Sequence, residues 1–591
     1  MKNINIIKNV ILKKNGIPAF AEMTISLVLC LMTFALVSCE DFLDKPAYGF
    51  LAEDDLTGIE QVENMCVGAY ATLANDDINH QQNLWGYGNV RADDAYKGGG
   101  GLDDNTELHW FEISSPSLDN QIGEPDVFWY RNYMAVSRIN SAIRALQAID
   151  EKKMPLKNTR IAEMRFLRAH FHFVNKICFK HIPYITEDLS TEDIAVESNV
   201  KYTSDEVWQK IAGDFDFAHK NLPPVQPEIG RANKYAAAAY LAKTYLYKAY
   251  RQDEMHNLTE INQAELQKVI ELADEIIASP YHLESDFAYN FLPGNYENGA
   301  EAIFSVQYSK EDGTHFGRLN YGSTLCVPTI DFKSPNMDFH KPSQSLVNAF
   351  ITQNGLPDAD GYNATDYNEA SNQVDPRLFH TVALPFKPYK YTGNEFTMQC
   401  ARTPGLYGYY SSLKENVDPN SEYLQRTHDN FAWYANSKNW IVLRYADVLL
   451  WKAEALIESH RHSEALPIIN ELRNRAAQSL SLIAWAATFS NVQIYRDGAN
   501  CTWTEDFARQ ALRWERRMEM SLEGSRFFDL VRWGIAAETM NAYYAKEKGA
   551  HSYYNGAQFV KNKHEYIPIP IQQLRWSKGL YKQNYGFPAN N

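Results

Sequence analysis

The stretch ADVLLWKAEAL, from Ala446 to Leu456, carries a residue spacing that also occurs at two earlier places in the chain. In each place an alanine, a large apolar residue and a second alanine follow at intervals of four and then three. The three sets are Ala162, Phe166 and Ala169; Ala242, Leu246 and Ala249; and Ala446, Leu450 and Ala453. These intervals put all three side chains on one helical face, where small residues let a second helix approach and the large one fills the gap. The repetition predicts a scaffold of tetratricopeptide-type helical hairpins.

Other amphipathic stretches supply packing partners for these helices. The expected partner helices cover residues 128–149, 204–221, 265–278, 463–477 and 506–522. Ser204 or Asp205 fits the N-cap of the second stretch, and Gly524 fits the C-cap of the last. The fold class that we predict is therefore mainly α.

Residues 281–440 interrupt the helical pattern and are rich in Gly, Pro, Asn, Tyr and Phe. Within them, EAIFSVQYS at residues 301–309 predicts a strand. A segment of this length is too long for a plain loop, so we expect a folded, loop-rich insertion bearing a few short strands. The predicted segments are a helical scaffold at residues 40–280 and 440–535, the irregular insertion at 281–440 and a C-terminal tail at 536–591.

The N-terminal residues 1–38 have the pattern of a secretory signal. A lysine-containing start precedes TISLVLCLMTFALVS at residues 24–38, an apolar run too short to span a membrane as a stable helix. The run ends in LVSC, which is typical of the lipobox of bacterial lipoproteins. We therefore expect the mature chain to begin at a lipidated Cys39 and to be held at a membrane only by that lipid.

The net charge and the spacing of the cysteines argue against two classes of ligand, nucleic acids and metal ions. The chain has 57 Lys+Arg against 73 Asp+Glu, a formal net charge of −16. A negative surface repels phosphate backbones, which argues against a nucleic-acid partner. The cysteines after Cys39 are far apart, odd in number and without metal-binding spacing, so we expect buried apolar side chains. No metal and no cofactor is expected.

The stretch RRMEMSLEGSRFFDLVRWG, residues 516–534, combines arginines and carboxylates with a glycine and a Phe-Phe pair. Glu515, Glu519 and Glu523 form a helical stripe beside several arginines. Arginines keep neighbouring carboxylates ionised, which makes them poor general acids, so we interpret this motif as structural. Hydrolase-elbow, zinc-protease and phosphate-loop motifs do not occur, and no pair of carboxylates stands out as that of a glycosidase.

Aromatic residues are plentiful, with 36 Tyr, 29 Phe and 12 Trp. Those of residues 85–110 and of the insertion have no helical periodicity; Trp433 and Tyr434 are examples. Each such ring either fills a small core or forms a platform on which the apolar face of a sugar stacks. Neighbouring Asp, Asn and Arg would then bind the sugar hydroxyls.

Seven stretches together resemble one family. They are CEDFLDKP (39–46), AEMRFLRAHFHF (162–173), GRANKYAAAAYLAKTYLYKAY (230–250), DPRL (375–378), LRYADVLLWKAEAL (443–456), ERRMEMSLEGSRFFDLVRWG (515–534) and EYIPIP (565–570). In this order they resemble the SusD/RagB-like outer-membrane nutrient-binding lipoproteins of Gram-negative bacteria. The resemblance spans residues 39–591. It implies a tetratricopeptide-like scaffold with an irregular glycan-binding face and no enzymatic activity.

The resemblance also implies partners and a location. Such proteins are lipid-anchored at the cell surface, on the outer membrane, and act as lids on SusC-like TonB-dependent transporters. They capture an oligosaccharide or polysaccharide and pass it into the transporter for nutrient uptake. The acidic residues after the lipidated cysteine suit surface export.

Ligand contacts in this family come from the loop after an early Asp-Asp element and from the insertion. Here the first corresponds to residues 91–94 and the loop up to Trp110, and the second to residues 336–342. Relatives often place a tryptophan in the second segment, where this chain has Met337 and Phe339, so the glycan is not defined. The candidate glycan-binding residues are Trp85, Arg91, Asp94, Tyr96, Trp110, Tyr296, Tyr321 and Phe339.

Three other functions fit the same residues. The scaffold could hold peptides or glycopeptides in place of glycans on the same kind of transporter. A surface glycoside hydrolase could assemble its carboxylates from distant loops. A lipoprotein could also use its helical hairpins for protein contacts alone.

Overall fold

The computed structural model describes residues 58–74, 82–120, 123–313, 317–329 and 337–588. They belong to one compact unit that spans Gly58–Asn591. The expected signal segment and Cys39 lie outside the described residues. Within the described residues, no helix is both long enough and apolar enough to cross a membrane.

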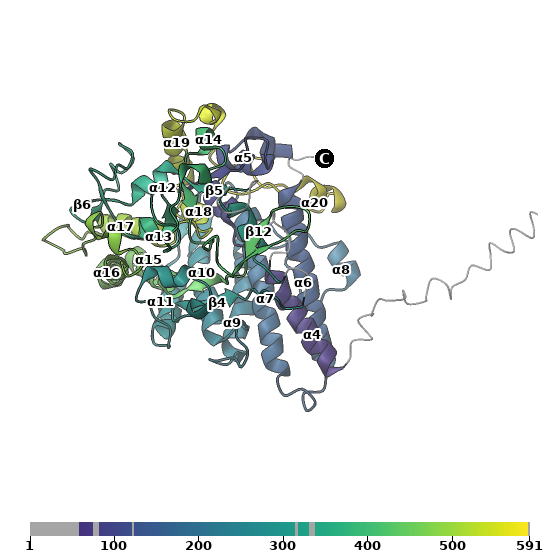
Figure 1. Ribbon diagram of the computed structural model, residues 1–591. Coiled ribbons are helices and arrows are strands. Elements are labelled where there is room, and N and C mark those ends of the chain that lie inside the picture. The colour runs from purple at the N-terminus through teal and green to yellow at the C-terminus, as the bar shows by residue number, and fades with distance from the viewer. Residues whose placement is uncertain (1–57, 75–81, 121–122, 314–316, 330–336, 589–591) are drawn as a thin grey trace, which may run out of the picture. The chain divides into compact units, whose positions relative to one another are not determined.

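The scaffold is a series of helices in which each packs on its neighbours along the chain. In the first half these are α4 (Ile59–Tyr70), α6 (Glu124–Ala148), α7 (Lys157–Phe179), α9 (Ser204–Asn221), α10 (Lys234–Ala249) and α11 (Gln263–Ile277). The second half supplies α15 (Tyr445–Glu458), α16 (His462–Gln478) and α17 (Glu505–Glu519). Helices α4, α6 and α7 run side by side in Figure 1, and α11 packs on α15, so the scaffold continues across the insertion. This arrangement confirms the predicted mainly α, tetratricopeptide-like fold.

The repeated spacing explains the helix packing. Its three sets lie on α7, α10 and α15, and all nine side chains are fully buried. Burying an apolar side chain contributes roughly 1.5–3 kcal/mol, and the small alanines keep the helix axes close. The pattern therefore forms the interior of the scaffold.

Two helix ends differ from the prediction. The N-cap of α9 is Thr203, because its Oγ1 accepts from the Glu206 N–H and the Glu206 carboxylate accepts from the Thr203 N–H in a capping box. Helix α17 ends at Glu519, before the predicted end at residue 522, because the chain turns towards Gly524. Gly524 has φ +82, and a Cβ there would lie 2.3 Å from the Asn83 carbonyl oxygen, so only glycine fits.

The insertion is held to the scaffold by a two-stranded ribbon. Strand β4 (Ala302–Val306) pairs antiparallel with β13 (Trp440–Arg444), with Trp440 opposite Val306. The ribbon therefore joins the start of the insertion to its end. The predicted strand at residues 301–309 is present in shorter form.

The other short strands form separate small sheets. The two-stranded pairs are β1 (Ala95–Gly98) with β5 (Phe339–Pro342), β2 (Tyr250–Gln252) with β3 (Leu258–Ile261), β9 (Val382–Ala383) with β10 (Ser411–Ser412), and β11 (Leu424–Arg426) with β12 (Tyr434–Asn436). A three-stranded sheet has the order β7 (Leu356–Pro357), β6 (Ile351–Gln353), β8 (Gln373–Val374). The shorter helices are α5 (Thr106–Ile113), α8 (Thr191–Ala195), α12 (Gln344–Ala349), α13 (Arg377–Thr381), α14 (Pro404–Tyr407), α18 (Arg526–Arg532), α19 (Ala536–Glu547) and α20 (Ile571–Trp576).

The cysteines of the described residues are thiols that are not joined to one another in disulfides. Cys66, Cys178, Cys326 and Cys400 are buried, as predicted, whereas Cys501 is partly exposed. Burial raises the pKa of the Cys178 thiol to about 12, so this side chain stays neutral and packs as an apolar group.

Candidate functional site

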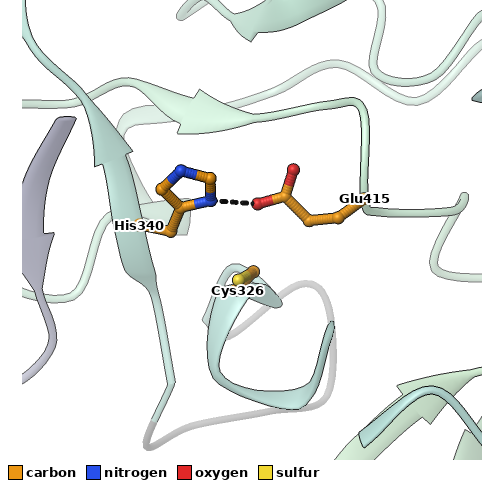
Figure 2. A group of neighbouring side chains, drawn as sticks. All are labelled: Cys326, His340 and Glu415. Atoms are coloured by element: carbon orange, nitrogen blue, oxygen red, sulfur yellow. Dashed lines mark hydrogen bonds and ion pairs between the residues drawn. The ribbon is translucent and has the colours of Figure 1, made fainter. Parts of the chain in front are cut away.

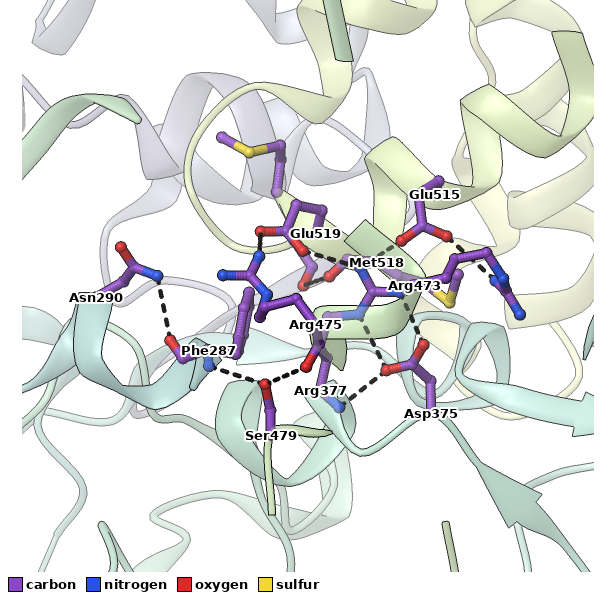
Figure 3. A network of polar contacts seen from close by, with 12 residues as sticks. Phe287, Asn290, Asp375, Arg377, Arg473, Arg475, Ser479, Glu515, Met518 and Glu519 are labelled. Atoms are coloured by element: carbon purple, nitrogen blue, oxygen red, sulfur yellow. Dashed lines mark hydrogen bonds and ion pairs between the residues drawn. The ribbon is translucent and has the colours of Figure 1, made fainter. Parts of the chain in front are cut away.

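The charged motif of residues 515–534 is an interior ion-pair network. Glu519 is fully buried and lies 2.8 Å from Arg377, 2.9 Å from Arg444 and 2.5 Å from Arg475. Glu515 pairs with Arg377 at 2.6 Å, and Figure 3 shows how these side chains converge from α17, α13 and α16. Burial alone would raise the pKa of Glu519, but the three arginines hold it well below its ordinary value. A carboxylate kept ionised in this way cannot donate a proton, so the network is structural.

Five of the eight candidate glycan-binding residues are buried. Asp94 accepts from Arg517 Nε at 2.9 Å, and the Tyr96 hydroxyl donates to Glu547 at 2.9 Å. Arg91 donates to the His564 carbonyl oxygen at 2.8 Å. These contacts tie the early segment to the charged motif and to the tail. They leave these three side chains without a surface for a ligand.

Trp85 and Phe339 are buried as well. Trp85 stacks on His340 with ring centroids 5.0 Å apart, and it is 1% exposed. Phe339 lies on β5 opposite Gly98 of β1 and is 3% exposed. Both rings are almost fully buried, so the structure gives both the role of core packing.

Beneath Trp85, three side chains that could bind a metal come together. Cys326, His340 and Glu415 each place a ligand atom within 4.8 Å of the others (Figure 2). His340 Nδ1 lies 2.5 Å from Glu415, and its Nε2 lies 2.9 Å from the Asn89 amide nitrogen. The Gly524 N–H donates to the Asn89 oxygen, so the amide presents its NH₂ group to His340 Nε2. The proton of His340 is therefore on Nδ1 and is donated to Glu415.

With the proton on Nδ1, Asn89, His340 and Glu415 are linked in series by hydrogen bonds. A metal on Nδ1 would have to displace that proton. Burial also raises the pKa of the Cys326 thiol well above its ordinary value, which keeps the sulfur protonated. Burial would raise the pKa of Glu415 too, but His340 and the Ser412 hydroxyl bring it down to about 2. These hydrogen bonds fix the orientation of the His340 ring, which stacks on Trp85.

Rings that are exposed or only partly buried instead gather on a hairpin of the insertion, residues 423–436, which we name the aromatic hairpin. Its strands β11 and β12 pair with Gln425 opposite Ala435. At its tip the Phe431 and Trp433 rings stack with centroids 5.1 Å apart and 20° between their planes. His428 lies 4.7 Å from Phe431 by ring centroids. Phe431 is 50% exposed, so the stack presents an open aromatic surface.

Short hydrogen bonds hold the hairpin tip in place. The Thr427 N–H donates to the Trp433 carbonyl oxygen at 2.8 Å, and Arg426 Nε donates to the Phe431 carbonyl oxygen at 3.0 Å. Trp433 packs against the core, while its Nε1–H is buried without an acceptor among the described residues. The stack is thus anchored on one side and open on the other, which is what a stacking platform requires.

A second pair of rings lies near the base of the hairpin. Tyr289 and Tyr296 have ring centroids 5.0 Å apart, and Tyr296 is 42% exposed. Gly294, with φ +72, packs against the Tyr423 hydroxyl, where an added Cβ would lie 2.6 Å away. This contact places the turn bearing Tyr296 beside the first residue of the aromatic hairpin.

Amide side chains accompany these rings. Gln307 exchanges two hydrogen bonds with Asn298, at 2.9 and 3.0 Å, and accepts from Asn439 at 2.8 Å. The Asn439 N–H donates to Glu297, next to Tyr296. Asn298 is exposed. Amides and carboxylates beside open rings are the groups that bind sugar hydroxyls.

Three candidate residues are not fully buried. Tyr296 lies beside the aromatic hairpin. Tyr321 is partly buried and directly follows Asn320, whose N–H donates to the Asn436 carbonyl oxygen at 2.8 Å, so it adjoins β12. Trp110 lies on α5 and packs partly against the core. The structure therefore brings Tyr296 and Tyr321 to the region of the hairpin.

Sequence reasoning missed His428 and Phe431 as candidates. The signal was present in THDNFAW, residues 427–433, where turn-forming residues alternate with rings. Rings on so short a turn cannot all be covered by the turn itself. The candidates carried over from the early Asp-Asp element have no such local signal.

Comparisons with known proteins agree with this fold. The profile of the SusD family matches residues 300–587, and a profile described as "Starch-binding associating with outer membrane" matches residues 41–246. The SusD-like protein P25 of Formosa agariphila is 25% identical in an alignment 565 residues long, which covers 93% of this chain and 96% of that protein. A SusD-like protein of Bacteroides ovatus is 23% identical and covers 86% of this chain and 82% of its own.

Solved structures give the same result. A laminarin-binding SusD-like protein superposes with a TM-score of 0.63 at 21% identity, covering 90% of this chain and 100% of its own. Surface glycan-binding protein A from Bacteroides fluxus gives a TM-score of 0.63 at 20% identity with the same coverage. The chain belongs to the SusD family, as its sequence motifs predicted.

Proposed function

We propose that this protein is a non-catalytic surface lipoprotein that captures oligosaccharides or polysaccharides on its aromatic hairpin. It then delivers them to a SusC-like TonB-dependent transporter in the outer membrane. The observation that carries the proposal is the stacked pair of Phe431 and Trp433 on an exposed turn. An open, rigid ring surface binds the apolar face of a sugar at a low cost in conformational entropy.

Relatives support the ligand class. One structural neighbour is named for binding laminarin, and another is named as a surface glycan-binding protein. The family profile that matches the N-terminal half is described as starch-binding and outer-membrane-associated. Membership of the SusD family supports the transporter partner, and the lipobox at Cys39 supports anchoring at the outer membrane with the protein facing outwards.

In this proposal Phe431, Trp433 and Tyr296 stack on successive sugar rings, and the amides around Gln307 bind hydroxyls. Tyr321 and Trp110 are proposed to contact the glycan at the margins. The absence of a catalytic role is supported by the ion-pair network of the charged motif, whose carboxylates stay ionised.

Two measurements test the proposal together. Tagged protein is isolated from outer membranes, and the material that co-purifies is identified; we expect a TonB-dependent barrel. The purified protein is also run in native gels cast with individual polysaccharides, where a bound glycan slows migration. Recovery without a barrel and without any retardation, or release of sugar products on prolonged incubation, would overturn the proposal.

A further inference from the structure

A pocket of about 280 Å³ lies in the helical scaffold and shares no residue with the aromatic hairpin. Its walls come from the start of α9, the end of α10, the β2–β3 hairpin and α18. Residues from distant parts of the chain therefore close around it, including Trp208, Tyr247, Arg251, Thr259 and Arg532. Its volume is close to the lower end of the range for small-molecule sites.

Two rings form one wall of this pocket. The centroids of Trp208 and Tyr247 are 5.8 Å apart with 45° between the planes, and both side chains are only partly buried. Phe173 packs against each ring, at 5.5 Å from Trp208 and 5.3 Å from Tyr247. The Arg532 guanidinium lies 5.2 Å from the Tyr247 centroid. These contacts fix the rings and leave an aromatic surface towards the pocket.

The charges around the pocket are already balanced. Lys248 pairs with Glu265 at 2.7 Å, Arg251 with Asp205 at 2.5 Å, and Arg532 with Asp529 at 2.9 Å. Glu454 gives Arg532 a second carboxylate partner. An anionic ligand would have to break one of these pairs, whereas a neutral ligand leaves them intact.

The pocket walls also carry hydroxyl groups beside the rings. The Thr259 hydroxyl donates to the Arg251 carbonyl oxygen at 3.2 Å, so its oxygen can still accept a hydrogen bond. The Ser204 oxygen accepts from Lys176 Nζ at 2.7 Å, so its O–H can donate. Groups that both donate and accept in this way match the hydroxyls of a neutral sugar.

From these contacts we propose that the scaffold pocket binds one neutral sugar ring as a second carbohydrate site. The apolar face of the ring stacks on Trp208 and Tyr247, and one hydroxyl oxygen accepts from the Ser204 hydroxyl. Thr259 and Arg251 contact the remaining hydroxyls. This proposal does not depend on glycan capture at the aromatic hairpin, because the two sites use different residues.

Saturation-transfer NMR with glucose, galactose, mannose, xylose and glucuronate tests the site in the purified protein. We expect at least one neutral sugar to receive saturation and to change Trp fluorescence with a millimolar dissociation constant, as befits a ligand with few heavy atoms. Trp208→Leu should weaken this binding at least tenfold. No binding of any neutral sugar, or tighter binding of glucuronate than of glucose, would overturn the proposal.

A second variant keeps the test valid if Trp208→Leu does not fold. Thr259 is exposed at the pocket mouth, so Thr259→Trp blocks entry without changing the core. Glu271→Trp adds the same side chain at an exposed position of α11 and is the matched control. Loss of sugar binding in Thr259→Trp alone supports the site, and equal binding in both variants contradicts it.

Discussion

The charged motif around Glu519 and the aromatic hairpin around Phe431 differ in the chemistry of their side chains and in the role that we assign to each. In the first, most of the charged side chains are buried in ion pairs, and three arginines surround one carboxylate. In the second, a stacked pair of rings is anchored on one side and open on the other. The charged side chains of residues 515–534 therefore lie mostly in the interior of this protein, and sparse rings on a short turn form its proposed binding surface.

The largest expected effect comes from breaking the first region. Glu519→Gln removes the shared counter-charge of Arg377, Arg444 and Arg475 in a fully buried position. Removing one partner of a buried ion pair costs about 3–5 kcal/mol of unfolding free energy. Chemical denaturation followed by circular dichroism measures this loss.

The matched control is Glu464→Gln. Glu464 pairs with Arg461 on the exposed side of α16, at 2.7 Å. Exposed pairs contribute little, so this substitution should leave the unfolding transition unchanged. If Glu519→Gln lowered the free energy of unfolding no more than this control does, the structural interpretation of the motif would be wrong.

Glu547 sharpens the comparison because it is a buried carboxyl that no arginine contacts among the described residues. Burial raises its pKa from 4.5 to about 7, and the Tyr96 hydroxyl donates to it. The folded protein therefore keeps a proton that the unfolded chain loses between these two values. The contribution of Glu547 to the free energy of unfolding should fall as the pH rises through this window and level off above pH 7.

Glu547→Gln should remove this pH dependence. The variant and the parent should be equally stable near pH 4.5, and the variant should be more stable at pH 8 by up to about 3 kcal/mol. Denaturation curves at both values compare the two proteins. A stability difference that does not change with pH would show that Glu547 is ionised in the folded state.

The sequence predicted more of the scaffold than of the site, for physical reasons. The spacing at Ala446, Leu450 and Ala453 has a helical period, and a period can be recognised without the structure. Burial of Trp85 and Tyr96 depends on contacts with His340 and Glu547, which are hundreds of residues away. No local pattern shows such contacts, so five candidate rings and charges were placed on a surface that they do not reach.

A smaller effect is expected at the aromatic hairpin. Phe431→Ala removes the half-exposed ring of the stack and should weaken glycan binding about tenfold, or ~1.4 kcal/mol, with little change in stability. Calorimetric titration with the best-retained polysaccharide measures this. Trp576→Ala is the control, because that ring is 64% exposed on α20 and lies outside the hairpin. Equal losses of glycan affinity in both variants would show that the aromatic hairpin is not part of the glycan-binding site.

The smallest effect is expected at the base of the hairpin. Tyr296→Ala removes an exposed ring that stacks on Tyr289, and affinity should fall about threefold, or ~0.7 kcal/mol. Long oligosaccharides should show this loss and short ones should not, because only a long chain reaches from the tip to the base. Tyr585→Ala, at another half-exposed ring, provides the comparison. A loss that is the same for short and long ligands would place Tyr296 at the tip subsite.

The most direct test of glycan capture is a titration of the lipid-free protein, residues 40–591, with a panel of polysaccharides and their oligomers. Binding heat and product release are followed in the same samples, for the parent and for Phe431→Ala. Our account predicts that one glycan binds without turnover and that Phe431→Ala weakens it about tenfold. The absence of binding to every glycan of the panel, an unchanged affinity in the variant, or the release of products would contradict our account.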